Sequence, residues 1–151
     1  MKQIKRVLLV AGCLTAFAMG AGNVSAQNRG NFDPAQFRQI RLSLAREPGH
    51  PEGDSGFAYV IIAPLDADDR IDATLWREHR EACRITRSRP DQEDQHGHLV
   101  HRGSGWAFSY PNTPDEVGHH FSDEHFVPGE YVSIDEGGKL HTYRVASVSH
   151  L

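Results

Sequence analysis

Two adjacent glycines near the end of the chain separate two segments of alternating polarity. The segment YVSIDE precedes Gly137-Gly138, and KLHTYRVASV follows it. A Gly-Gly connection is typical of a tight β-hairpin, and side chains alternate between the two faces of a strand. The register of such a hairpin pairs Glu136 with Lys139 and Val132 with Tyr143. The apolar face of this hairpin is then formed by Val132, Ile134, Tyr143 and Val145.

The pattern repeats in the middle of the chain. Residues 97–102 and 105–110 flank Gly103-Ser104, and this spacing predicts a second hairpin. In its register His101 lies opposite Trp106, on a face that also carries Leu99 opposite Phe108. The run FAYVIIAP at 57–64 is rich in β-branched and aromatic residues, so we expect a central strand that ends at Pro64.

The segment from residue 37 has two interpretations. Ile40, Leu42 and Leu44 alternate with Arg41 and Ser43, and this period of two predicts a half-buried strand. The alternative is a helix that opens at Asp33-Pro34, because Asp is a good cap and Pro suits the first helical position.

One helix of about three turns is expected after the acidic turn at 65–72. The apolar positions of ATLWREHREAC at 73–83 follow a helical period, with Asp72 as the cap. Residues 83–89, CRITRSR, then continue as a short strand. The helical face consists of Leu75, Trp76, His79, Ala82 and Cys83.

Loops rich in Pro and Gly or in polar residues separate these elements, at 47–56, 90–95 and 111–129. Short strands at close spacing with one helix predict a small α+β domain. Its strands form a mostly antiparallel β-sheet or a partly closed barrel.

The first 26 residues have the features of a secretory signal peptide. MKQIKR supplies three cations, a short apolar run follows, and Val24-Ser25-Ala26 provides small residues before a cleavage site. We expect cleavage between Ala26 and Gln27 and a secreted or periplasmic mature chain. Lipidation at Cys13 and a membrane anchor are the alternatives, but the apolar run is short for a span of about 20 residues. Residues 27–36 then form a flexible lead, and residues 37–151 form a single domain.

The composition of the mature chain restricts the kinds of partner that it can bind. Loss of Lys2, Lys5 and Arg6 changes the formal charge from −4 to −7, which argues against nucleic acid as a partner. No membrane span is expected in the mature chain. Cys83 is its only cysteine, so no internal disulfide forms and we expect a buried thiol.

Histidine stands out, because all ten histidines follow residue 26 and several of them cluster. Imidazole is a common ligand of zinc and copper. His96 and His98 are two residues apart and point to the same face of a strand. A third ligand would come from His119, His120 or His125, or from His141. Because spacing fixes only two ligands and catalytic zinc sites need three, a structural role for the hairpin histidines is the alternative.

Two short motifs do not support a catalytic or calcium site. Gly53-Asp54-Ser55-Gly56 matches the string around a serine-protease nucleophile, but only His50 precedes it in the mature chain, in the same loop. The aspartates at 66–72 lack the glycine and the final carboxylate of a calcium-binding loop. A glycine-rich turn and a helix cap explain both.

The sequence therefore favours an exported binding or interaction domain of the cell envelope. Its partner would be a small ligand or an envelope protein, and arginine and histidine side chains suit an anionic or polar ligand. A histidine-rich metal-binding protein or metal-dependent enzyme, with zinc or copper as cofactor, is the alternative. No sequence motif assigns an enzymatic activity.

Overall fold

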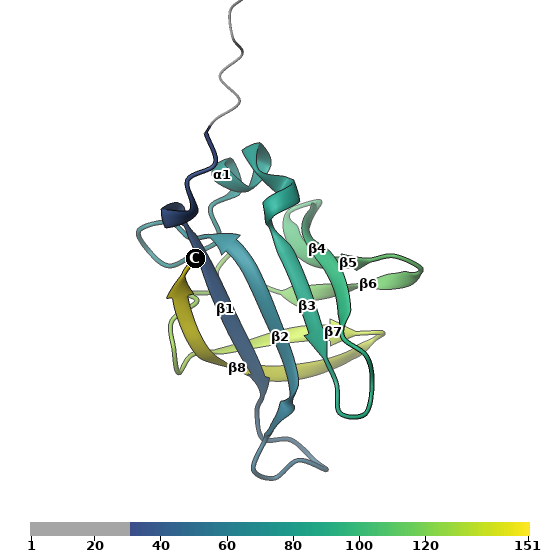
Figure 1. Cartoon of the computed structure of the whole chain (residues 1–151). Helices are drawn as coiled ribbons and strands as arrows, with labels where there is room; N and C mark the ends of the chain where they lie inside the picture. Colours follow the sequence, from purple (N-terminus) through teal and green to yellow (C-terminus); the bar gives the residue numbers. More distant parts are fainter. Residues whose placement is uncertain (1–30) are drawn as a thin grey trace, which may run out of the picture.

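Eight strands follow one another around a closed antiparallel barrel in the computed structural model, which describes residues 31–151 (Figure 1). Each strand pairs with the next one along the chain, and β8 returns to pair with β1. The strands are β1 (Phe37–Leu44), β2 (Asp54–Pro64), β3 (Arg84–Ser88), β4 (Gln95–Arg102), β5 (Gly105–Tyr110), β6 (Thr113–His119), β7 (Tyr131–Glu136) and β8 (Lys139–His150).

The predicted fold is confirmed: the domain is mostly antiparallel β-structure with one short α-helix in the described part of the chain. The barrel is fully closed, which leaves no strand of it with an unpaired edge. The predicted signal peptide and its cleavage site lie outside the described residues.

Both predicted hairpins form in the predicted registers. Glu136 pairs with Lys139 and Val132 with Tyr143 across the Gly137-Gly138 turn. His101 pairs with Trp106 in the β4–β5 hairpin, where Leu99 also pairs with Phe108. The segment from residue 37 is strand β1, and the competing helix is reduced to one 3-10 turn at Pro34–Gln36, capped by Asp33.

The barrel interior is filled by side chains from all eight strands. Residues at alternate strand positions point inward, as expected when a sheet closes on itself. The largest fully buried side chains are Trp106, Tyr59, Tyr143, Phe37, Phe108, Phe121, Phe126, Ile40, Leu42, Ile61, Ile85 and Leu99.

One end of the barrel is closed by the helical segment, which is shorter than predicted. Helix α1 (Ala73–Glu78) begins at the predicted cap, because the Asp72 carboxylate accepts hydrogen bonds from the amides of Thr74 and Leu75. It ends at His79, and a 3-10 turn at Arg80–Ala82 follows. The prediction of about three helical turns was therefore wrong, since the chain must leave the helix to enter β3 at Arg84. The buried Trp76 side chain attaches the helix to this end, because its indole nitrogen donates a hydrogen bond to the Leu99 carbonyl of β4.

The prediction of a loop at 111–129 was also wrong in part, because this segment contains strand β6. Glu116 and Gly118 are the buried positions of this strand, so its inner face is not apolar. A search for apolar alternation does not detect such a strand.

The opposite end of the barrel carries the β1–β2, β3–β4, β5–β6 and β7–β8 connections, and we call it the mouth. Figure 1 shows the β1–β2 and β3–β4 connections below the barrel, away from α1. No helix among residues 31–151 combines the length and the apolar character needed to cross a bilayer.

Candidate functional site

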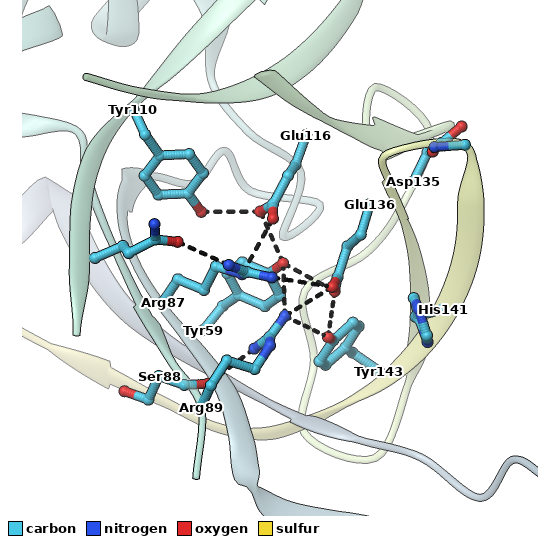
Figure 2. A network of polar contacts seen from close by, with 12 residues as sticks. Tyr59, Arg87, Ser88, Arg89, Tyr110, Glu116, Asp135, Glu136, His141 and Tyr143 are labelled. Carbon is cyan, nitrogen blue, oxygen red and sulfur yellow. Dashed lines mark hydrogen bonds and ion pairs between the residues drawn. The ribbon is translucent and has the colours of Figure 1, made fainter. Parts of the chain in front are cut away.

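Seven inward-facing polar side chains meet at the mouth, and we call them the mouth network. They come from six different strands, β2, β3, β5, β6, β7 and β8, with Arg89 just beyond the end of β3. Figure 2 shows their side chains pointing toward one another. The members are Tyr59, Arg87, Arg89, Tyr110, Glu116, Glu136 and Tyr143.

Glu136 is the most connected carboxylate of the mouth network. Its Oε2 atom lies 2.9 Å from Arg89 Nη2 and 3.4 Å from Arg87 Nη2. Its Oε1 atom accepts hydrogen bonds from the hydroxyls of Tyr59 and Tyr143. Both carboxylate oxygens are thus occupied by donors, and the network holds this side chain in one position (Figure 2).

Glu116 is the second buried carboxylate. Its Oε2 atom accepts from the hydroxyl of Tyr110 at 3.0 Å and lies 2.8 Å from that of Tyr59, whose single hydrogen is shared between Glu116 and Glu136. Its Oε1 atom lies 3.1 Å from Arg87 Nε, a pair that is ionic without the alignment of a hydrogen bond. Arg87 also donates to Gln95 Oε1, so it connects both glutamates to strand β4.

Burial and these contacts raise the pKa values of the tyrosines and of the arginines in the network. Burial raises the pKa of Tyr59 well above its ordinary value, and the neighbouring Tyr143 and Glu116 add to the rise. Burial disfavours the charge of Arg89, but Tyr143, Tyr59 and Glu136 outweigh it and raise the pKa of this guanidinium. The phenols therefore stay protonated donors and the arginine stays charged.

The pKa of Glu136 moves in the opposite direction. Desolvation by burial would raise it, but hydrogen bonds from Tyr143, Arg89 and Tyr59 and the charge of Arg89 lower it overall. The glutamate is held ionised between two arginines. The mouth network is consequently a set of paired charges with fixed geometry.

The mouth network lines open space. Two adjoining pockets, of about 370 and about 300 Å³, share Arg87, Glu136, Lys139 and His141 in their walls. Loop residue Glu47 borders the larger pocket and accepts from His141 Nδ1 at 2.9 Å. We call the larger of these two spaces the mouth pocket.

The mouth pocket also has an apolar wall. Leu44, Pro48 and Phe57 contribute to it. The Phe57 ring contacts the Arg89 guanidinium at 5.2 Å and the His50 ring at 5.1 Å, measured to the ring centroid. A cleft with apolar walls and a few fixed polar groups is the usual form of a small-molecule site.

The predicted metal ligands lie in different places. His96 and His98 share the outer side of β4, where His96 Nδ1 lies 3.3 Å from Thr86 Oγ1 and His98 Nε2 lies 3.7 Å from Glu81. His119 and His120 contact each other at 4.0 Å between ring centroids. His125 donates from Nδ1 to the Asp68 carbonyl at 2.6 Å.

No group of three or more His, Cys, Asp and Glu side chains within residues 31–151 has an arrangement that could hold a metal ion. The structure brings His119 and His120 into contact, whereas the other candidates have separate partners. Zinc or copper binding stays a prediction from the sequence.

The β4–β5 hairpin has an aromatic face, as its register predicted. His101 contacts Trp106 at 4.7 Å and Trp76 at 6.0 Å between ring centroids. Beside it, His98, Arg80 and Glu81 line a groove of about 510 Å³ on the outside of the barrel. This outer groove lacks a buried charged network.

Sequence reasoning did not identify the members of the mouth network. One signal was present: in the strand at 83–89, the alternating positions Ile85, Arg87 and Arg89 share one face. A row of this kind predicts an inward arginine pair once the barrel is known to close. Comparisons with protein-family models, curated proteins and solved structures gave no match.

Proposed function

We propose that this protein is an exported binding domain of the cell envelope, and that the mouth pocket is its ligand site. The observation that carries the proposal is the mouth network. Two arginines, two glutamates and three tyrosines are fixed from six strands at the open end of a barrel whose centre is apolar.

Stability alone does not require such a network. Burying charged pairs costs desolvation energy, and well-packed apolar residues often stabilise a core equally well. A network with a purely structural role is expected to be sealed, but this one borders two pockets. Rigid strands that hold polar groups in place are the usual support for a binding site.

The binding proposal is tested by nuclear magnetic resonance with a library of small neutral, cationic and anionic fragments. We expect amide shift changes that saturate and cluster on the β1–β2 and β3–β4 loops and around Phe57, Glu136 and His141. Binding that localises to the outer groove near Trp76 instead, or no saturable binding at all, would contradict the proposal.

A pair of matched variants separates the two sites. Gln92→Trp places a large side chain at the exposed rim of the mouth pocket, and Arg80→Trp does the same at the outer groove. We expect the first variant to block fragment binding and the second to leave it unchanged.

The proposed compartment is supported by the sequence of residues 1–26. Expression in a bacterium with a periplasm, followed by fractionation and intact-mass measurement, tests it. We expect a periplasmic or secreted chain that begins at Gln27. A cytosolic pool that retains Met1 would refute the compartment and leave the ligand site to be judged separately.

A further inference from the structure

We infer that the mouth pocket takes a small organic monoanion, a carboxylate carried on a short apolar body, and that Lys139 is the cation that pairs with it. This inference rests on the proposed function of the mouth pocket. It follows from which hydrogen-bonding groups of the site are already occupied.

The carboxylates of the site already face internal donors. Both oxygens of Glu136 and both oxygens of Glu116 lie against tyrosine hydroxyls or guanidinium nitrogens. Both oxygens of Glu47 face Nδ1 of His141, at 3.1 and 2.9 Å. A cationic ligand at Glu136 or Glu116 would have to compete with these internal donors.

Donors, in contrast, are in excess. Arg87 uses Nη1 for Gln95 and Nη2 for Glu136, and each of these nitrogens carries two hydrogens. Lys139 lines both adjoining pockets, yet within the described residues its ammonium has no ion-pair or hydrogen-bond partner. A ligand that satisfies these groups must present acceptor oxygens.

The fold keeps the side chain of Lys139 from forming an ion pair with Glu136, its neighbour across the hairpin. Lys139 pairs with Glu136 in the backbone register of the β7–β8 hairpin. The Glu136 side chain, however, turns inward to Arg89 and the tyrosines. The hairpin thus leaves one full positive charge at the pocket wall without a carboxylate.

The charge and shape of the pocket further restrict the class of ligand that it can bind. One uncommitted lysine matches one negative charge, whereas Glu47 and Glu136 in the same walls would repel a second. Leu44, Pro48 and Phe57 provide an apolar surface for the rest of the molecule. A volume of about 370 Å³ lies at the small end of the range for ligand sites.

Lys139 can be observed selectively, because it is the only lysine of the chain beyond residue 5. Reductive methylation with ¹³C-formaldehyde places a resonance on Lys139, which is assigned with the Lys139→Arg variant. Benzoate is titrated as the monocarboxylate, benzamide as its neutral analogue, benzylamine as a cation and phenyl phosphate as a dianion. Acetate tests the need for the apolar body.

We expect benzoate to shift the Lys139 resonance saturably and to bind about tenfold more tightly than benzamide, the size expected for a hydrogen bond to a charged group. Lys139→Met should weaken benzoate binding by a similar factor, and Lys139→Arg should retain it. Arg144→Met removes an exposed cation from the same strand and serves as the control. Acetate and phenyl phosphate should bind more weakly than benzoate.

Two results would overturn the inference about the ligand class alone. One is binding of benzamide or benzylamine at the mouth that equals or exceeds that of benzoate. The other is tighter binding of phenyl phosphate, which would indicate a phosphate site. Absence of any fragment at the mouth would instead remove the proposed function together with this inference.

Discussion

At the scale of single residues, the mouth network has a fixed geometry, and removal of one of its charged side chains strongly lowers the stability of the fold. A buried ion pair adds little net stability, but loss of one partner leaves the other charge unpaired in a medium of low polarity. We expect the largest loss of stability at Glu136, because its carboxylate neutralises the charges of both Arg87 and Arg89.

Glu136→Gln should lower the free energy of unfolding by about 3 kcal/mol at pH 7. The folded pKa of Glu136 lies below its ordinary value of 4.5, so its contribution is present above that pH and is lost as the pH falls through the folded pKa. The difference between wild type and variant should therefore narrow below about pH 4.5 in urea unfolding curves.

Glu52→Gln provides the control for this measurement. It removes the same charge from the Arg46–Glu52 pair, where both side chains are largely exposed. A change below about 0.5 kcal/mol is expected there. Equal effects of the two substitutions would show that the mouth network is not a coupled set of charges.

Cys83 presents the opposite case, a reactive group that the fold makes inert. Its side chain is fully buried, as the sequence predicted, and burial raises the pKa of the thiol to about 12. Native protein should react with a thiol reagent only as fast as it opens, and denaturant should restore full reactivity. In a Cys83→Ala background, Ser149→Cys supplies an exposed thiol for comparison, and native Cys83 labelling at that same rate would contradict the burial.

At the scale of elements, a glycine determines how closely strands β4 and β5 of one hairpin approach each other. A Cβ atom on Gly97 would lie 2.3 Å from the Ser109 carbonyl oxygen and 2.7 Å from the Tyr110 ring. This absence of a side chain lets Tyr110 lie where its hydroxyl reaches Glu116. The glycine of strand β4 thus contributes to the mouth network without a polar group.

Gly97→Ala should therefore destabilise the protein by about 1–3 kcal/mol, the usual cost of overpacking a core. It should also displace Tyr110 from Glu116, visible as a change in the tyrosine ring resonances. Gly105→Ala in the same hairpin meets no atom closer than 3.9 Å and is the matched control. If both alanines are tolerated equally, the close approach of β4 and β5 is not required.

The same elements explain which parts of the fold the sequence could predict. Hairpins with apolar inner faces and glycine turns were predictable, since local periodicity and turn chemistry agree there. Strand β6 was not, because Glu116 occupies a buried position that the pattern assigns to solvent. Helix α1 was predicted too long, because apolar spacing alone does not show where the chain must turn into β3.

The candidate site was less predictable than the fold for a related reason. Clustering in the sequence drew attention to His96, His98, His119, His120 and His125. The mouth network instead joins residues as far apart as Tyr59 and Glu136, and only barrel closure brings them together. Spacing along the chain contains no information about such a set until the register of all eight strands is known.

At the scale of the whole molecule, closure of the barrel by β1 and β8 is the feature on which everything else depends. The final residues of β8 pair with the beginning of β1, from Arg38 opposite His150 to Arg41 opposite Ser147. Their hydrogen bonds complete the ring that holds the mouth network from six strands. Without them, β1 would present an unpaired edge from Arg38 to Arg41, while residues 42–44 would keep their partners in β8.

Deletion of residues 146–151 should therefore lower the free energy of unfolding by at least about 3 kcal/mol, since each lost backbone hydrogen bond contributes about 1 kcal/mol. The exposed edge should also promote self-association, detectable by analytical ultracentrifugation. Removal of Leu151 alone, which lies beyond β8, is the control and should leave both properties unchanged. A truncated chain that stays monomeric and unfolds at the wild-type urea concentration would show that this half of the β1–β8 seam is not needed to hold the barrel together.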